Sequence, residues 1–281
     1  SIAAWWVIEL GCLRLPRVSR QKTWGLLNFS AFITMPVVIF VEGLFLAVGA
    51  GLLIAWLVQQ SAYSTLVNQL QNLMYVNPDS MPLILEQLRP LLKEPVIIAA
   101  VFISFSLVIP MVEELLKPLA LWFFIKRLWS PTEGFIAGMI SGAAFAMVES
   151  LIALASADSA TWLVTVAARS GTALLHITTA GLSGWALTST WLDGKYLRVG
   201  ITYLVTVFIH GLWNFLAVSA GFNSFATEDA LQIPSRLAPA APWIMGVLVA
   251  LMIILLLLVN NRLRHQQASQ IPPPFPLPGQ A

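Results

Sequence analysis

The sequence predicts an all-α protein that crosses a membrane several times, and three observations support this prediction. Hydrophobic residues make up 58% of the chain and charged residues only 10%, whereas about 25% of an ordinary soluble domain is charged. Apolar runs near the ~20 residues that a helix needs to cross a bilayer repeat along the chain. The basic residues gather on one side of the membrane if these runs alternate in direction. A net charge of +2 gives no reason to expect a nucleic-acid partner.

Six spans are predicted from the apolar runs, at 34–58, 96–125, 134–156, 162–191, 199–221 and 242–260. The second and fourth exceed a simple crossing, so we expect tilt or a kink, in the second span at Pro110 or Pro118. Residues 2–13 are too few to cross alone. They form either an interfacial helix or the remnant of an earlier crossing, which would make seven spans.

The predicted organisation has three parts. Residues 1–33 form a cytoplasmic or interfacial segment, residues 34–260 the membrane domain, and residues 261–281 a basic and then proline-rich tail. The polar stretch 59–95 is expected to hold surface helices near 65–75 and 81–92. Ten basic residues share one side of the membrane: Arg14, Arg17, Arg20, Lys22, Lys126, Arg127, Lys195, Arg198, Arg262 and Arg264. Only Arg89, Lys93 and Arg236 fall on the other side, so both termini are predicted to be cytoplasmic.

Acidic and imidazole side chains occur at similar depths in four of these spans. Glu113 lies 13 residues before Lys126, and Glu149 lies 15 after Gly134. His176 lies 16 residues before Leu192, and His210 lies 11 after Val199. At 1.5 Å per residue, these depths are roughly 16 to 24 Å within a ~30 Å hydrocarbon core. Ionisable groups at that depth are costly and usually functional.

Helical spacing pairs these groups with neighbours four residues away, because such residues share a helix face. The pairs are Glu113 with Lys117, Phe145 with Glu149, and His210 with Asn214. Lys117 can stabilise a neighbouring carboxylate, which would then act as a general base for water. His210 and Asn214 offer donors for an oxyanion. Glycines at 134, 138 and 142 form a small-residue ridge that allows another helix to approach closely.

The ordered motifs Glu113-Glu114-x-x-Lys117, Phe145-x-x-x-Glu149, His176 and His210-x-x-x-Asn214 resemble the PrsW family of intramembrane proteases. That family is related to the CAAX prenyl proteases and bacteriocin-processing enzymes. The similarity covers about residues 96–220. CAAX-type relatives carry a histidine at the position of Glu149 and an arginine one place after Lys117, so both departures point to the PrsW branch.

The resemblance implies hydrolysis of peptide bonds in membrane-associated or single-span proteins, anti-sigma factors among them, at a prokaryotic plasma membrane. Glu113 would activate a water, with Glu114 and Lys117 tuning its charge. Glu149 and His176 would position that water, or a metal ion. His210 and Asn214 would face the developing oxyanion.

Two other hydrolytic mechanisms are compatible with the sequence. Zinc held by Glu149, His176 and His210 is the first, although two histidines are few for hydrolytic zinc and the chain has no His-Glu-x-x-His motif. We therefore expect no cofactor, with zinc as the alternative. The second is a serine mechanism, since GLSG at 181–184 matches a rhomboid-like pattern and His210 offers a base. Helix packing explains that pattern better.

Functions outside hydrolysis also remain open. Midplane glutamates and histidines suit a proton pathway or transporter, although no internal repeat is visible. A non-catalytic scaffold could bind transmembrane helices through the glycine ridge. Buried ion pairs that only fix helix register are a further possibility. Glu42 and Arg169 each stand alone on a span, so we expect them to have a pairing partner or a water-facing position rather than a catalytic role.

Overall fold

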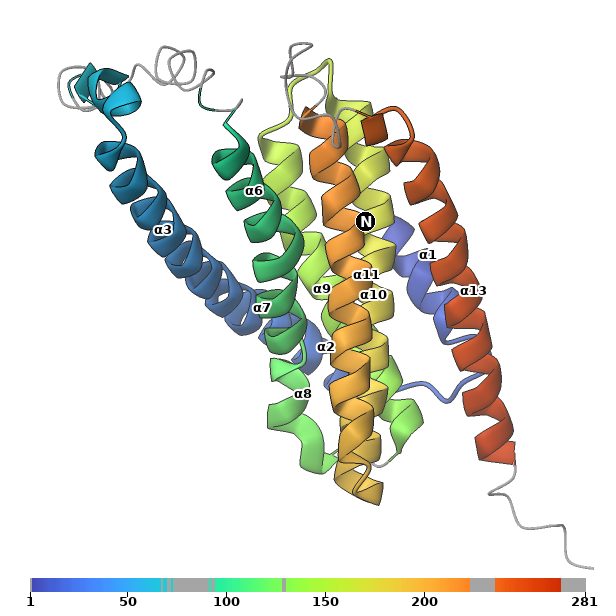
Figure 1. Cartoon of the computed structure of the whole chain (residues 1–281). Helices are drawn as coiled ribbons and strands as arrows, with labels where there is room; N and C mark the ends of the chain where they lie inside the picture. Colours follow the sequence, from blue (N-terminus) through green and yellow to red (C-terminus); the bar gives the residue numbers. More distant parts are fainter. Residues whose placement is uncertain are drawn as a thin grey trace, which may run out of the picture. The chain divides into compact units, whose positions relative to one another are not determined.

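The computed structural model describes residues 2–66, 68–69, 72, 91, 94–127, 130–222 and 236–268. Every regular element in these ranges is helical, which confirms the all-α class (Figure 1). The predicted surface helix at 81–92 and the tail at 271–281 lie outside the described residues, and the predicted helix at 65–75 lies largely outside them.

The long helices follow the predicted spans closely. The α-helices are α1 (Ile2–Gly11), α2 (Arg20–Phe29), α3 (Met35–Gln59), α6 (Pro95–Ile103), α7 (Ile109–Leu116), α8 (Leu119–Phe124), α9 (Pro131–Ala155), α10 (Trp162–Asp193), α11 (Tyr196–Phe222) and α13 (Ala241–Ala268). Two π-helical segments, η1 (Ser30–Thr34) and η4 (Ser104–Val108), interrupt the first and second spans. Within the predicted stretch 2–13, residues 2–11 form the helix α1.

Five helical stretches of the described residues are long and apolar enough to cross a membrane: Arg20–Gln59, Pro95–Phe124, Pro131–Ala155, Tyr196–Gly221 and Ala241–Ala268. Each matches one predicted span, although the predicted spans 96–125 and 134–156 end one residue beyond the helical stretch. The remaining predicted span is α10, which has 32 residues and is therefore long enough to cross. Its polar side chains, Arg169 and His176 among them, lower its mean hydropathy, so the count of six stays a prediction.

The second span is interrupted at Lys117 and Pro118, between the end of α7 and the start of α8. Proline has no backbone N–H, and its ring clashes with the carbonyl of the residue four positions earlier, which breaks a helix. The predicted break at Pro118 is therefore present. Pro110, the other candidate, lies within α7, directly after η4.

The chain divides into two compact units. Unit 1 comprises residues 1–35, 117–206 and 249–281, and unit 2 comprises residues 36–116 and 207–248. The division falls between Leu116 and Lys117, so the predicted site residues are distributed over both units.

The centre of unit 1 is the antiparallel pair α9 and α10 (Figure 1). A Cβ atom added to Gly134, Gly138 or Gly142 would lie 2.1 to 2.3 Å from the nearest atom of α10. The carbonyl oxygens facing the three glycines belong to Gly184, Ala180 and His176, in that order. Residues four apart on α9 therefore match residues four apart on α10. The glycine ridge packs against a helix backbone, as its spacing predicted.

Unit 2 contains η4 and the part of α11 that packs against it. The rings of Phe102 and Phe215 lie 5.1 Å apart between centroids. A Cβ on Gly211 would lie 2.4 Å from the carbonyl oxygen of Ser106, so only glycine allows this approach of α11 to the π-helical segment. The approach sets the position of His210, which is adjacent to Gly211.

Candidate functional site

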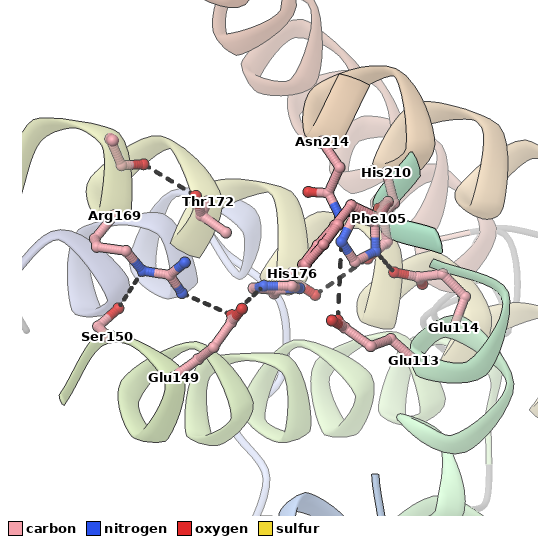
Figure 2. A network of polar contacts seen from close by, with 12 residues as sticks. Phe105, Glu113, Glu114, Glu149, Ser150, Arg169, Thr172, His176, His210 and Asn214 are labelled. Carbon is pink, nitrogen blue, oxygen red and sulfur yellow. Dashed lines mark hydrogen bonds and ion pairs between the residues drawn. The ribbon is translucent and has the colours of Figure 1, made fainter. Parts of the chain in front are cut away.

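In unit 2, His210 of α11 lies between the two adjacent glutamates of α7 (Figure 2). Its Nδ1 is 2.8 Å from Glu114 Oε1, and its Nε2 is 3.8 Å from Glu113 Oε2. Glu113, Glu114 and His210 are each at most 4% exposed. Consecutive residues of a helix point about 100° apart, which lets the two carboxylates reach opposite edges of one imidazole ring.

The hydrogen bond to Glu114 determines which edge of the His210 ring faces Glu113. An ionised carboxylate only accepts hydrogen bonds, so with Glu114 ionised His210 Nδ1 would donate to Glu114 Oε1. The 3.8 Å from His210 Nε2 to Glu113 Oε2 is too long for a hydrogen bond. The two atoms therefore face each other without a direct hydrogen bond between them.

The side chain of Asn214 is bound by the π-helical segment η4. A π-helical turn displaces the regular helical hydrogen bonds and leaves carbonyl groups in need of donors. Asn214 Nδ2 donates to the carbonyl oxygen of Phe105, at 3.0 Å (Figure 2). One of its two amide hydrogens is thus used to satisfy the backbone of the neighbouring span.

In unit 1, the fully buried His176 of α10 binds Glu149 of α9. His176 Nε2 is 2.7 Å from Glu149 Oε2, and Arg169 Nη2 donates to that same oxygen at 2.6 Å. Arg169 Nε also donates to Ser150 Oγ at 3.3 Å. Figure 2 shows these groups in a line, Ser150–Arg169–Glu149–His176. The expectation that Arg169 has a pairing partner is confirmed, and the partner is Glu149.

Lys117 is a further buried charged residue of unit 1. It is 1% exposed, and its Nζ lies 4.9 Å from the ring centroid of Phe145. A cation over an aromatic face is stabilised by the ring quadrupole, most strongly when it is desolvated. The ring of Phe145 also lies 5.1 Å from that of His176. Phe145 therefore contacts both a buried cation and a buried imidazole.

Each unit thus brings some of the predicted residues together. Glu113, Glu114 and His210 meet in unit 2, and Asn214 lies next to η4 in the same unit. In unit 1, Glu149 binds His176, and Phe145 contacts both His176 and Lys117. Sequence reasoning did not identify the partner of Arg169, although an arginine alone in an apolar span and a glutamate on the preceding span were visible signals.

The donor atoms fit a zinc ion in part. Two ligand atoms on one tetrahedral zinc lie roughly 3.3 Å apart, at Zn–N and Zn–O distances of about 2 Å. The 3.8 Å between His210 Nε2 and Glu113 Oε2 is near that separation. Metal-binding histidines usually donate their other ring N–H to a carboxylate. Glu114 serves His210 in this way, and Glu149 stands in the same relation to His176.

The serine alternative has no support in the packing. Gly181 and Gly184 face α9, where an added Cβ would lie 2.8 Å from a side-chain atom of Met139 and 2.2 Å from the carbonyl oxygen of Gly134, respectively. The two glycines of GLSG are therefore required for helix packing.

A comparison with protein-family models matches residues 23–259 to the family described as PrsW family intramembrane metalloprotease. This is the family that the motifs predicted. No curated protein and no solved structure matches the chain.

Proposed function

Because the chain belongs to the PrsW family of intramembrane metalloproteases and is therefore a membrane peptidase, we propose that it cleaves single-span or membrane-associated proteins with Glu113 as the base. The observation that supports this role most is the buried His210 between Glu113 and Glu114. Glu114 binds one ring nitrogen of His210, so Glu113 is the carboxylate that faces the other ring nitrogen.

In the proposed reaction, Glu113 accepts the proton of the attacking water and later transfers it to the leaving amine. His210 stabilises charge on the carbonyl oxygen of the peptide. Lys117 supplies the positive charge that keeps a glutamate ionised in the apolar span. Asn214 supports His210 indirectly, because its amide binds the carbonyl of Phe105 on the span that carries the glutamates.

The family description favours the metal alternative over a metal-free mechanism. His176 and His210 would be the imidazole ligands, and Glu113 the carboxylate beside the ion. Glu149, a predicted ligand, suits an orienting role better, since a single oxygen accepts from both His176 and Arg169. When bound, zinc would lower the pKa of its water and polarise the peptide carbonyl. The similar depths of the polar groups along four predicted spans support a functional role for them.

The proposed location is a prokaryotic plasma membrane with both termini in the cytoplasm. The asymmetry of the basic residues supports this orientation. Anti-sigma-factor-like proteins are the substrates that the family resemblance suggests. Reporter fusions at the two ends of the chain test the orientation directly, and an extracytoplasmic signal at either end would contradict it.

The experiment compares the amino termini of membrane proteins in cells that express the wild type, Glu113→Gln or Glu114→Gln at matched levels. Glu133→Gln is a matched control, because Glu133 lies outside both groups and pairs with Lys22 at 3.3 Å. New termini near single-span helices are expected with the wild type and the control, and not with the other two. If both Glu113→Gln and Glu114→Gln produce the same termini, the proposed chemistry is wrong. If no protein yields new termini, the proton-pathway and scaffold functions take precedence.

A further inference from the structure

Arg169 is a charged side chain within an apolar helix of unit 1. It lies seven residues after Trp162, the first residue of α10, which corresponds to about 10 Å along the helix. An arginine at such depth is costly in a membrane unless it is paired. Its side chain is only 17% exposed and binds Glu149, which is 30% exposed.

Two contacts fix the guanidinium group of Arg169. Nη2 donates to Glu149 Oε2 at 2.6 Å, and Nε donates to Ser150 Oγ at 3.3 Å. Glu149 and Ser150 are consecutive residues of α9. Two nitrogens of the planar guanidinium therefore bind neighbouring side chains. These contacts hold its positive charge next to one oxygen of Glu149, Oε2.

That oxygen also binds His176. The distance from Glu149 Oε2 to His176 Nε2 is 2.7 Å. Arginine has only donors and keeps its charge, so the carboxylate beside it is held in its acceptor form. A carboxylate that accepts from both sides requires a hydrogen on His176 Nε2. The lone pair of the neutral ring is then on Nδ1, at the other edge.

We propose that Arg169 is a positioning residue that sets the tautomer of His176 through Glu149. Two further contacts restrain His176, one at its ring and one at its backbone. Phe145 packs against it at 5.1 Å between centroids, and Gly142 contacts the His176 carbonyl oxygen through a gap too narrow for a Cβ. The contacts Ser150–Arg169–Glu149–His176 are present in the structure whatever reaction the protein catalyses. That Nδ1 then binds metal rests on the proposed function.

The test is NMR of the histidine ring nitrogens in the full chain, purified in detergent at mildly alkaline pH, where an ordinary histidine is neutral. The chain has three histidines, so His176→Gln assigns the resonances. In the wild type, Nε2 of His176 is expected to carry the hydrogen, and Nδ1 is expected to carry none. Arg169→Met should lose this pattern and show hydrogen on Nδ1 as well, while Arg169→Lys should keep it. Arg198→Met is the control, because Arg198 stacks on Trp185 at 4.6 Å and is outside this group.

A wild-type spectrum with hydrogen on Nδ1 of His176 overturns the proposal, even if Arg169→Met does not fold. An unchanged His176 pattern in folded Arg169→Met also overturns it, since a purely structural ion pair would alter thermal stability alone. Added zinc provides the separate test of the proposed function. If Nδ1 of wild-type His176 does not respond to zinc while Nε2 keeps its hydrogen, the metal assignment is wrong and the positioning role of Arg169 stands.

Discussion

Gly142→Ala is expected to impair the peptidase by displacing His176. An alanine Cβ at this position would lie 2.3 Å from the His176 carbonyl oxygen and 2.9 Å from its carbonyl carbon. Ordinary contact begins at 3.4 Å, so α10 must retreat from α9 by about 1 Å. The obstacle is helix backbone, which cannot rotate away as a side chain can.

The size of the effect follows from two opposing contributions. Replacing a helical glycine by alanine stabilises a helix by about 1 kcal/mol. Overpacking a dense interface costs about 1–3 kcal/mol. The net loss of unfolding free energy is therefore expected to reach about 2 kcal/mol. A shift of about 1 Å in a positioned group can lower a rate by roughly 100-fold, so activity should fall much more than stability.

The assay measures cleavage of a substrate identified from the amino-terminus comparison, together with thermal unfolding in detergent. Gly49→Ala is the matched control, because Gly49 lies in α3 and an added Cβ would meet no atom within 4 Å. The control should retain full activity and unfold at or above the wild-type temperature. If Gly142→Ala behaves like this control, the close packing of α9 on α10 does not position His176, and the reasoning fails.

Three further outcomes are expected. Glu114→Gln should weaken zinc binding by roughly 10–100-fold, as loss of a ligand-orienting carboxylate typically does. Calorimetric titration measures this, with Glu133→Gln as the control. Equal zinc affinities of the two variants would contradict the prediction. Prolonged treatment with a chelator should abolish cleavage, and added zinc should restore it. Activity that persists in a sample shown by metal analysis to contain no bound metal would support the metal-free mechanism. Burial, followed by the nearby charge of Glu9, raises the pKa of the Cys12 thiol to about 12. At neutral pH the thiol is thus protonated and unreactive in the folded state, and alkylation should be slow until the protein unfolds; rapid alkylation of the native chain would refute this.

Much of the helical architecture could be predicted from the sequence, because the bilayer imposes a length on apolar runs. Five of the six predicted spans match, to within one residue at their ends, parts of helices that are long and apolar enough to cross. The glycines at 134, 138 and 142 also predicted a close helix contact, since their spacing puts them on one face. Only the structure shows which carbonyl groups of α10 face these glycines, because the sequence of α10 does not indicate them.

The candidate site was less predictable. Depth along each span predicted that imidazoles and carboxylates lie at one level, but depth does not specify which pairs form contacts. Asn214 was predicted to face an oxyanion, and its donation to Phe105 depends on the π-helical segment η4. The sequence of that segment, SFSLV, has no feature that separates a π-helix from an α-helix. The roles assigned to the individual residues stay predictions.

The segment η4 also has a consequence for how related sequences should be aligned. One residue more or less in a helix turns everything after it by about 100° and shifts it by 1.5 Å. A relative with a regular helix at this point should therefore have one residue fewer before its glutamate pair, and a gap is best placed within 104–108. Such a relative has no displaced carbonyl to satisfy, so the amide at position 214 and the glycine at 211 should be lost together with the extra residue. Co-variation of these three features would trace the insertion through evolution.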